Sequence, residues 1–196
     1  VHIYTDGSIQ ANHGGTEMGQ GLHTKISQIV ANEFGISIDQ VDITSTRTDK
    51  VPNTSPTAAS SGTDLNGKAV QNACITLKER LATCFAESQN QPDCADQVLF
   101  IDGQVILGEA TIAFSDLVQA AYFERVSLSA SGFYKTPKLQ YNRDTGEGRP
   151  FFYFAYCIFP YFLFVTENMI KFNCFNFPVF LKIIQYLSSL VICQFY

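Results

Sequence analysis

The stretch from His13 to Lys25, HGGTEMGQGLHTK, gathers residue types that bind ligands: four glycines, two histidines, a glutamate and a glutamine. Glycine loses more backbone freedom on folding than any other residue, so four glycines this close together need a structural reason. The stretch is either a surface loop or a place where the backbone closely approaches a ligand. A glycine-rich turn that enters a helix directs backbone N–H groups and the positive helix end at an anion, and this is the chemistry the pattern favours.

The same stretch does not match the common motifs that bind nucleotides or zinc. From Gly19 the sequence runs GQGLHT, which puts Thr24 where the third glycine of a dinucleotide fingerprint belongs, and the Gly-Lys-Ser/Thr ending of a P-loop is missing. His13 and His23 do not have a zinc spacing, and the sequence places no third ligand near them. We therefore expect both to be hydrogen-bonded structural histidines. We expect Glu17 to be a solvated residue without a catalytic role.

A second stretch, SPTAASSGTD from Ser55 to Asp64, has a similar character. A proline-fixed turn leads through small residues into a helix, which leaves N–H donors and hydroxyl groups accessible. Taken alone, this stretch is explained by helix capping through Ser60, Ser61, Thr63 and Asp64. Together, the two stretches predict a polyanionic or richly polar ligand held between two helix N-termini.

Hydrophobic periodicity and turn signals in the first 156 residues predict an α+β fold, with mixed sheets and packed helices. Asp6-Gly7 and Asp102-Gly103 are strong hairpin signals. Gly35 stands where a helix commonly ends. We expect strands at 1–4, around Ile9, at 41–43, within 98–107 and at 126–131, and helices through Ile26, Ile29, Val30 and Phe34, through Leu65, Ala69, Ala73, Leu77 and Leu81, and at 116–123.

Charge and cysteine usage exclude several classes of protein. The net charge is −5 and no Lys/Arg cluster occurs, which argues against a nucleic-acid partner. Six cysteines without a C-x-x-C pair exclude a zinc ribbon or an iron–sulfur run, and we expect reduced thiols in a cytoplasmic protein. The N-terminus has no secretory signal pattern, and the missing initial methionine predicts a fragment.

The composition changes after Tyr156. Residues 157–196 contain no glycine and are dominated by Phe, Ile, Leu, Tyr, Asn and Lys. Within them Pro178 to Tyr196 barely reaches the ~20 residues of a membrane-spanning helix, and Lys182 would cost roughly 2.5 to 3.5 kcal/mol at a helix centre. We expect this divergent apolar tail to be translated non-coding or frame-shifted sequence outside the native fold, with no membrane partner. A membrane-associated product is the alternative.

Three motifs, HGGTEMGQGLHTK, VPNTSPTAASSGTD and GFYKTPKLQYNRDTGEGRPFFYFAY, agree in order and separation with a known family. Over residues 1–156 the sequence resembles the second molybdenum-binding domain of the xanthine dehydrogenase and aldehyde oxidase family, and is closer to the xanthine dehydrogenase branch. The resemblance implies a partial molybdopterin-binding domain at 1–156. It also implies that the molybdopterin lies between two molybdenum domains and is met by backbone amides and small polar side chains.

The resemblance assigns site residues to both stretches. It implies that Gly19 and Gln20 face the dithiolene and oxo end of the cofactor. Ala59 matches the small residue whose backbone amide lies beside the molybdenum, so it is the expected metal-site residue. The remaining expected cofactor contacts in the same turn are Thr57, Ala58, Ser60 and Ser61.

The resemblance also limits what this chain does by itself. In the family, a glutamate in a Gly-Glu-Pro-Pro context is the general base, and no Gly-Glu-Pro occurs here, so we expect no catalytic residue in this chain. The complete enzyme is expected to oxidise hypoxanthine or xanthine to urate, a reaction of purine catabolism. It would carry 2Fe-2S clusters, FAD and the first molybdenum domain on other domains or subunits.

Two alternatives stay open for the function. In the first, the complete protein is an aldehyde oxidase-like enzyme, because the residues that choose between purine and aldehyde lie outside this chain. In the second, the chain is a non-catalytic cofactor-binding or assembly module. For the complete enzyme we expect a homo-oligomer in the cytoplasm.

Overall fold

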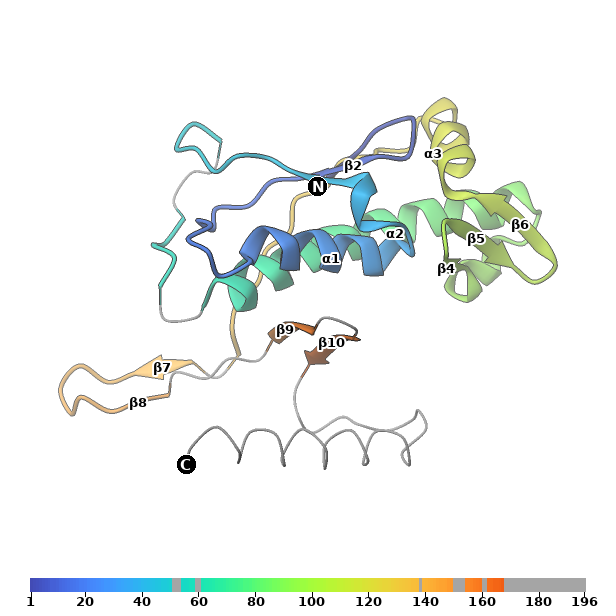
Figure 1. The fold of residues 1–196 in the computed structure, drawn as a ribbon. Coiled ribbons are helices and arrows are strands. Elements are labelled where there is room, and N and C mark those ends of the chain that lie inside the picture. The colour runs from blue at the N-terminus through green and yellow to red at the C-terminus, as the bar shows by residue number, and fades with distance from the viewer. Residues whose placement is uncertain (51–53, 59–60, 138, 150–153, 160–161, 168–196) are drawn as a thin grey trace. The chain divides into compact units, whose positions relative to one another are not determined.

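The computed structural model describes residues 1–50, 54–58, 61–137, 139–149, 154–159 and 162–167. It contains helices together with small mixed and antiparallel sheets (Figure 1), which confirms the α+β class. In chain order they are β1 (His2–Ile3), β2 (Ile9–Ala11), α1 (Leu22–Phe34), the 3₁₀ turn η1 (Ile38–Gln40), β3 (Val41–Ile43), the π-helical turn η2 (Gly62–Gly67), α2 (Lys68–Ser88), the 3₁₀ turn η3 (Pro92–Gln97), β4 (Leu99–Ile101), β5 (Gln104–Leu107), β6 (Ala110–Ala113), α3 (Phe114–Phe123), β7 (Gln140–Tyr141), β8 (Gly148–Arg149), β9 (Phe154–Phe159) and β10 (Phe162–Glu167).

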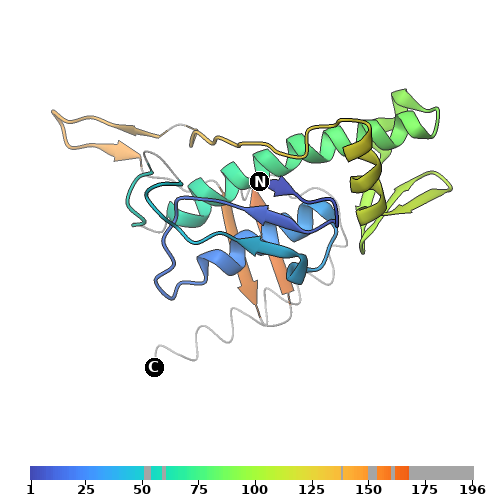
Figure 2. The ribbon, with the colours of Figure 1, turned by 90° about the horizontal axis from the view of Figure 1, so that it is seen from above.

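The first sheet has the order β1-β2-β3 and lies on α1. β1 and β2 form the antiparallel hairpin predicted around Asp6-Gly7, whereas β2 and β3 are parallel and are joined by α1. Parallel neighbours need such a crossover, because a tight turn cannot connect them. Seen from above, the sheet lies in front of α1 and α2 runs alongside (Figure 2). The loop that precedes α1 therefore begins at the end of β2, in the middle of this sheet.

Helix α1 ends where the sequence predicts. Ile26, Ile29, Val30 and Phe34 are buried, and Gly35 caps the helix in the left-handed conformation with φ of 61°. A Cβ at Gly35 would also meet the backbone carbonyl of Phe100. Glycine is therefore required at this position for its positive φ and for the close approach of the β4 backbone.

The second helix begins as a π-helical turn, η2, and continues as α2. The wider turn rotates the residues that precede it relative to those that follow. The predicted face is correct for Ala73, Leu77 and Leu81, but Leu65 and Ala69 are only half buried. The prediction was wrong at its N-terminal end because a regular α-helical period was assumed there. The buried positions include Asp64, Gly67, Val70 and Cys74 instead.

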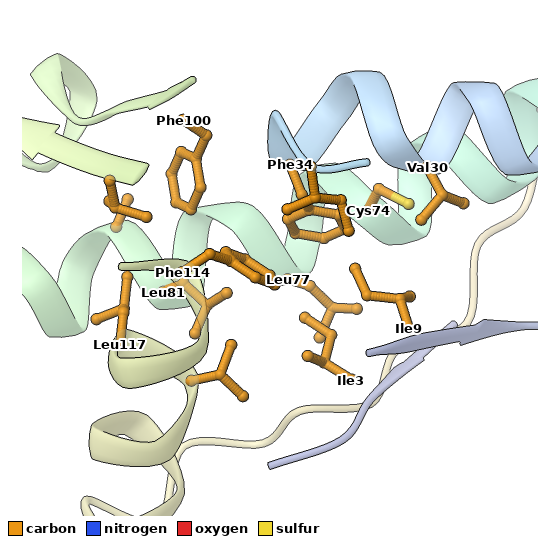
Figure 3. Packing of buried hydrophobic residues seen from close by; sticks show 14 of the residues in the cluster. Ile3, Ile9, Val30, Phe34, Cys74, Leu77, Leu81, Phe100, Phe114 and Leu117 are labelled. Atoms are coloured by element: carbon orange, nitrogen blue, oxygen red, sulfur yellow. The ribbon is translucent and has the colours of Figure 1, made fainter. Parts of the chain in front are cut away.

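Three aromatic rings join the second sheet to the helices. The sheet has the order β4-β5-β6, and its first turn carries the predicted Asp102-Gly103, with φ of 49° and 74°. Phe34 of α1, Phe100 of β4 and Phe114 of α3 pack with ring centroids 5.6 to 6.5 Å apart (Figure 3). One continuous core thus includes the end of α1, the middle of α2 and the start of α3.

The strand predicted at 126–131 is wrong. This segment makes one isolated bridge, His2 to Ser129, and backbone hydrogen bonds that join Leu128 to Ile3 and Ala130 to Val1. The two-residue β1 offers no room for a longer ladder. Arg80 of α2 donates Nη1–H bonds to the carbonyls of Ser127 and Ser129, at 3.1 and 2.9 Å, so these carbonyls are satisfied by a side chain. The segment is therefore extended chain that the hydrogen bonds from Arg80 hold against α2.

The cysteine prediction fits the part of the chain that the structure describes. Cys74, Cys84 and Cys94 are free thiols there. Burial raises the pKa of the Cys74 thiol to about 12, so it is protonated and unreactive at neutral pH. No helix in the described ranges is long and apolar enough to cross a membrane. The segment from Pro178 to Tyr196 lies outside those ranges.

We predict that Gly35→Ala destabilises the chain more than Gly103→Ala. Both glycines have positive φ, which costs an alanine roughly 1–2 kcal/mol, but only Gly35 has backbone within reach of the new Cβ. Overpacking of that kind adds about 1–3 kcal/mol. Urea unfolding of both variants measures the difference. Equal free energies of unfolding would contradict the close approach.

Candidate functional site

A pocket of about 420 Å³ lies where the two glycine- and serine-containing stretches meet the starts of α1 and η2. Volumes of this size are typical of small-molecule sites. The walls come from four segments: the loop before α1, the first turn of α1, the turn before η2, and η2 itself. The lining residues are Met18, Gln20, Leu22, Lys25, Thr57, Ala58, Gly62 and Thr63.

Direct contacts hold the two stretches together. The Thr16 amide donates a hydrogen bond to Thr57 Oγ1 at 2.8 Å. At Gly62 of η2, a Cβ would lie 3.3 Å from the Leu22 side chain. Gly14 packs against the side chain of Thr54, and this leaves no space for a larger residue. Small residues and one hydroxyl group therefore allow two stretches that are far apart in the sequence to lie in contact.

Glu17 is the anchor of the loop that precedes α1. Its Oε1 accepts hydrogen bonds from the amides of Gly19 at 2.8 Å and Gly21 at 3.1 Å, and its Oε2 accepts one from the His23 amide at 3.0 Å. The bond from His23, followed by those from Gly19 and Gly21, lowers the pKa of Glu17 to about 2. Glu17 is half exposed, in keeping with the expected solvated residue, but its part in ordering the loop was not expected: these amides at the start of a helix attract its carboxylate.

The position of Glu17 changes the expected chemistry of this loop. Amides that were expected to meet an external anion donate to a carboxylate of the same chain. The side chains that this loop and α1 contribute to the pocket lining include those of Gln20 and Lys25. The N–H groups of Gly19, Gly21 and His23 serve the loop itself.

The Gln20 side chain bridges its own loop. Its Oε1 accepts the Met18 amide at 2.6 Å, and its Nε2 donates to the Thr16 carbonyl at 2.7 Å. A primary amide has two N–H donors and two acceptor lone pairs, so these bonds use half of its capacity. The remaining N–H group and lone pair are chemically able to meet a ligand in the pocket that Gln20 lines.

Glycine is required in this loop for two different reasons. Gly19 and Gly21 have φ of 95° and 71°, a conformation that residues with side chains rarely adopt. Gly15 is needed for space, since a Cβ there would lie 2.5 Å from the side chain of Leu22. The close approach is thus to the protein's own chain at Gly15, and a backbone turn explains the other two.

The two histidines form a ring pair in this stretch, with His13 buried and His23 half buried. Their rings pack edge to face with centroids 5.2 Å apart, and His13 Nδ1 accepts the Gly15 amide at 3.1 Å. Burial and, to a smaller extent, the nearby His23 lower the pKa of His13 to about 4, while Glu17 opposes both effects. His13 is therefore hydrogen-bonded through Nδ1 as predicted, but among the residues that the structure describes the buried Nε2 atoms of both rings have no hydrogen-bond partner, so the prediction of hydrogen-bonded histidines was wrong at these atoms. Within the described ranges no cluster of three or more His, Cys, Asp or Glu is suited to a metal ion.

The structure brings together three of the residues that the sequence assigns to a cofactor: Gln20, Thr57 and Ala58 line the same pocket. Gly19 lies in the loop next to it but is not one of the described lining residues. Ser61 precedes η2 and donates its Oγ–H to the Ala58 carbonyl at 2.8 Å, so its hydroxyl does not cap the helix. Ala59 and Ser60 lie outside the described residues.

Sequence reasoning missed several residues of the pocket wall. Lys25 had a recognisable signal, because a cation in the first turn of a helix opposes the helix dipole and so suggests a nearby anion. Met18 and Leu22 had no signal, since their types fit a buried core equally well. Gly62 was read only as part of a helix start.

A model of one protein family, described as a molybdopterin cofactor-binding domain, matches residues 1–165 of this sequence. The chain belongs to this family. The match covers both stretches that line the pocket, so the observed pocket and the family description concern the same part of the chain. It confirms the family resemblance inferred from the three motifs.

Curated relatives of the chain are named xanthine dehydrogenases. It is 45% identical over 156 residues to xanthine dehydrogenase/oxidase of Felis catus, which covers 80% of this chain and 10% of that protein. Against xanthine dehydrogenase of Blastobotrys adeninivorans the identity is 48% over 156 residues, with 79% and 10% covered. The chain therefore spans about a tenth of the length of these relatives.

Solved structures with a similar fold come from other oxidoreductases. Quinoline 2-oxidoreductase of Pseudomonas putida 86 superposes with a TM-score of 0.64 at 20% identity, covering 76% of this chain and 21% of that chain. CO dehydrogenase of Oligotropha carboxidovorans gives a TM-score of 0.62 at 26% identity, covering 69% and 18%. At 20% identity, the comparison with quinoline 2-oxidoreductase supports a shared fold and nothing more.

We predict that His13 makes folding sensitive to acid. Because its pKa falls from an ordinary 6.5 to about 4 in the folded chain, the unfolded chain takes up a proton first as pH drops. Its contribution is complete above pH 6.5 and is lost between 6.5 and 4, by up to roughly 3 kcal/mol. Urea unfolding at pH 7 and pH 4.5 measures this loss.

His13→Asn and His2→Asn are the matched variants for this test. The asparagine oxygen at position 13 still accepts the Gly15 amide but does not titrate, so the acid sensitivity is expected to shrink. His2 is exposed and serves as the control. An unchanged pH dependence in His13→Asn would show that other groups cause it.

Proposed function

We propose that this chain forms part of the molybdopterin site of a xanthine dehydrogenase-like molybdenum hydroxylase, which oxidises hypoxanthine and xanthine to urate. The observation that carries the proposal is the pocket between the starts of α1 and η2, built from the two stretches on which the family resemblance rests. The names of the relatives favour a purine over an aldehyde as the substrate of the complete protein.

The residues around the pocket fit an anionic, polar cofactor. Lys25 offers a positive charge, and Thr57 and Thr63 offer hydroxyl groups. Thr57 Oγ1 accepts the Thr16 amide, so its own proton is available as a donor. Ala58 and Gly62 add little bulk to the lining. A phosphate-bearing pterin would find charge, donors and space in this arrangement.

Each residue of the site has a proposed role. By the family resemblance, the residues that would contact the cofactor are Thr57, Ala58, Ala59, Ser60 and Ser61, and Ala59 is the expected metal-site residue. Gln20 offers its remaining N–H group, and Gly19 keeps the backbone turned. When bound, the molybdenum centre would supply the redox chemistry. The residues of this chain bind and orient the cofactor and limit the space around it.

The rest of the reaction is assigned to other parts of the complete protein. This chain has no Gly-Glu-Pro sequence, and we propose no catalytic residue within it. The general base, the first molybdenum domain, the 2Fe-2S clusters and the FAD would come from the remaining domains or subunits. The cytoplasmic location, the homo-oligomeric state and the domain boundary at Tyr156 stay predictions.

We predict that Ala58→Leu lowers the molybdopterin content of the complete protein. The larger side chain would enter the pocket, and overpacking costs about 1–3 kcal/mol, equivalent to roughly five- to 150-fold weaker retention. Ala120→Leu on the exposed side of α3 is the matched control. Pterin fluorescence after release, together with metal analysis, measures the content. Normal content in Ala58→Leu would count against the pocket as the cofactor site.

We also predict that the isolated chain does not transfer electrons from xanthine. Loss of a general base alone typically reduces a rate by about 10² to 10⁴, and the partner domain is absent as well. Dye reduction by the purified chain, supplied with molybdopterin and xanthine, is expected to equal the buffer blank. Turnover above the blank would place a catalytic group in this chain.

A further inference from the structure

We propose that Glu17 is a positioning residue, which holds the loop before α1 so that Met18, Gln20 and Leu22 form one wall of the cofactor pocket. This inference rests on the proposed function and adds to it a residue that makes no contact with the cofactor. Its basis is an alternation along the chain. The backbone amides of Gly19, Gly21 and His23 donate hydrogen bonds to Glu17, while the side chains of the residues that directly precede them line the pocket.

The amides that bind Glu17 belong to alternate residues. Gly19 and Gly21 donate to Oε1, and His23 donates to Oε2, at 2.8, 3.1 and 3.0 Å. One carboxylate thereby fixes three points along the chain. Both glycines have positive φ, which turns their N–H groups toward the same acceptor.

The residues that directly precede these three points line the pocket. Met18, Gln20 and Leu22 line the pocket, and each is followed directly by a residue whose amide is held by Glu17. Met18 is 66% exposed, so core packing does not fix its position. Hydrogen bonds determine the shape of the loop. Those that Glu17 accepts span more of the loop than those of Gln20, because one of them comes from the amide of His23.

A carboxylate suits this task better than a neutral side chain. Charge-assisted bonds to N–H groups are stronger than neutral ones, and an anion is favourable at the start of α1. The starts of α1 and η2 line the same pocket, so their positive ends lie near each other. Glu17 compensates for this in the absence of any ligand. The loop is thus ordered before the cofactor arrives, which lowers the entropic cost of binding.

The test compares Glu17→Ala and Glu17→Gln in the complete protein. Glutamine retains an oxygen for Gly19 and Gly21 but presents an NH₂ group to the His23 amide, so it loses one bond of three. Glu109→Gln, in the exposed turn between β5 and β6, is the matched control for the loss of charge. Hydrogen exchange of the peptide containing residues 17–23 is measured on cofactor-free protein, and molybdopterin content on protein as purified.

Exchange is expected to become roughly tenfold faster or more in Glu17→Ala and less so in Glu17→Gln, with molybdopterin content falling in the same order. The melting temperature of the cofactor-free protein is expected to match that of the control. Unchanged exchange would overturn the positioning role. Faster exchange with normal molybdopterin content would overturn it too, as would a melting temperature that falls in step with the content.

The proposed function fails in a distinguishable way. If the unmodified complete protein carries no molybdopterin, the site assignment is wrong and positioning for that cofactor is refuted with it. The exchange data on cofactor-free protein would still report whether Glu17 orders the loop. Should Glu17→Ala fail to fold, Glu17→Gln retains two of the three bonds and supplies the comparison.

Discussion

The packing of α1 against α2 is the constraint on which the rest of the structure depends. The buried side of α1, with Val30 and Phe34, meets Cys74 and Leu77 of α2 in one core (Figure 3). Because the starts of both helical segments line the same pocket, like ends of two helix dipoles are brought together. Negative charge nearby stabilises such an arrangement, typically by about 0.3–1 kcal/mol for each charge. Glu17 supplies some of it, and the pocket is suited to a ligand that brings more.

Much of the fold could be predicted because its signals are local. Asp6-Gly7 and Asp102-Gly103 specify turns through their own backbone preferences, and Gly35 ends α1 for the same reason. The segment at 126–131 was misread because its residues suit a strand, while its actual partners, Arg80 and the very short β1, lie far away in the sequence. The π-helical turn of η2 likewise depends on tertiary contacts that periodicity does not contain.

The candidate site could be predicted in part. Two loops rich in small residues suggested a shared ligand, and Gln20, Thr57 and Ala58 do line one pocket. The role of Glu17 could not be found from residue types, because a carboxylate that meets three amides looks in the sequence like any surface glutamate. Its partners are backbone groups, which every residue except proline carries, so no pattern of side chains reveals them.

The alternation along residues 17–23 separates two tasks within one short segment. The anchoring bonds use backbone N–H groups, which are the same whatever side chain is present, provided that the chain keeps its turn at Gly19 and Gly21. Of the intervening positions, position 18 is free to change its side chain without loosening the loop, because Met18 is 66% exposed, whereas Gln20 bridges the loop and Leu22 is buried. A change at position 18 would therefore alter what one part of the pocket recognises while the backbone scaffold stays the same.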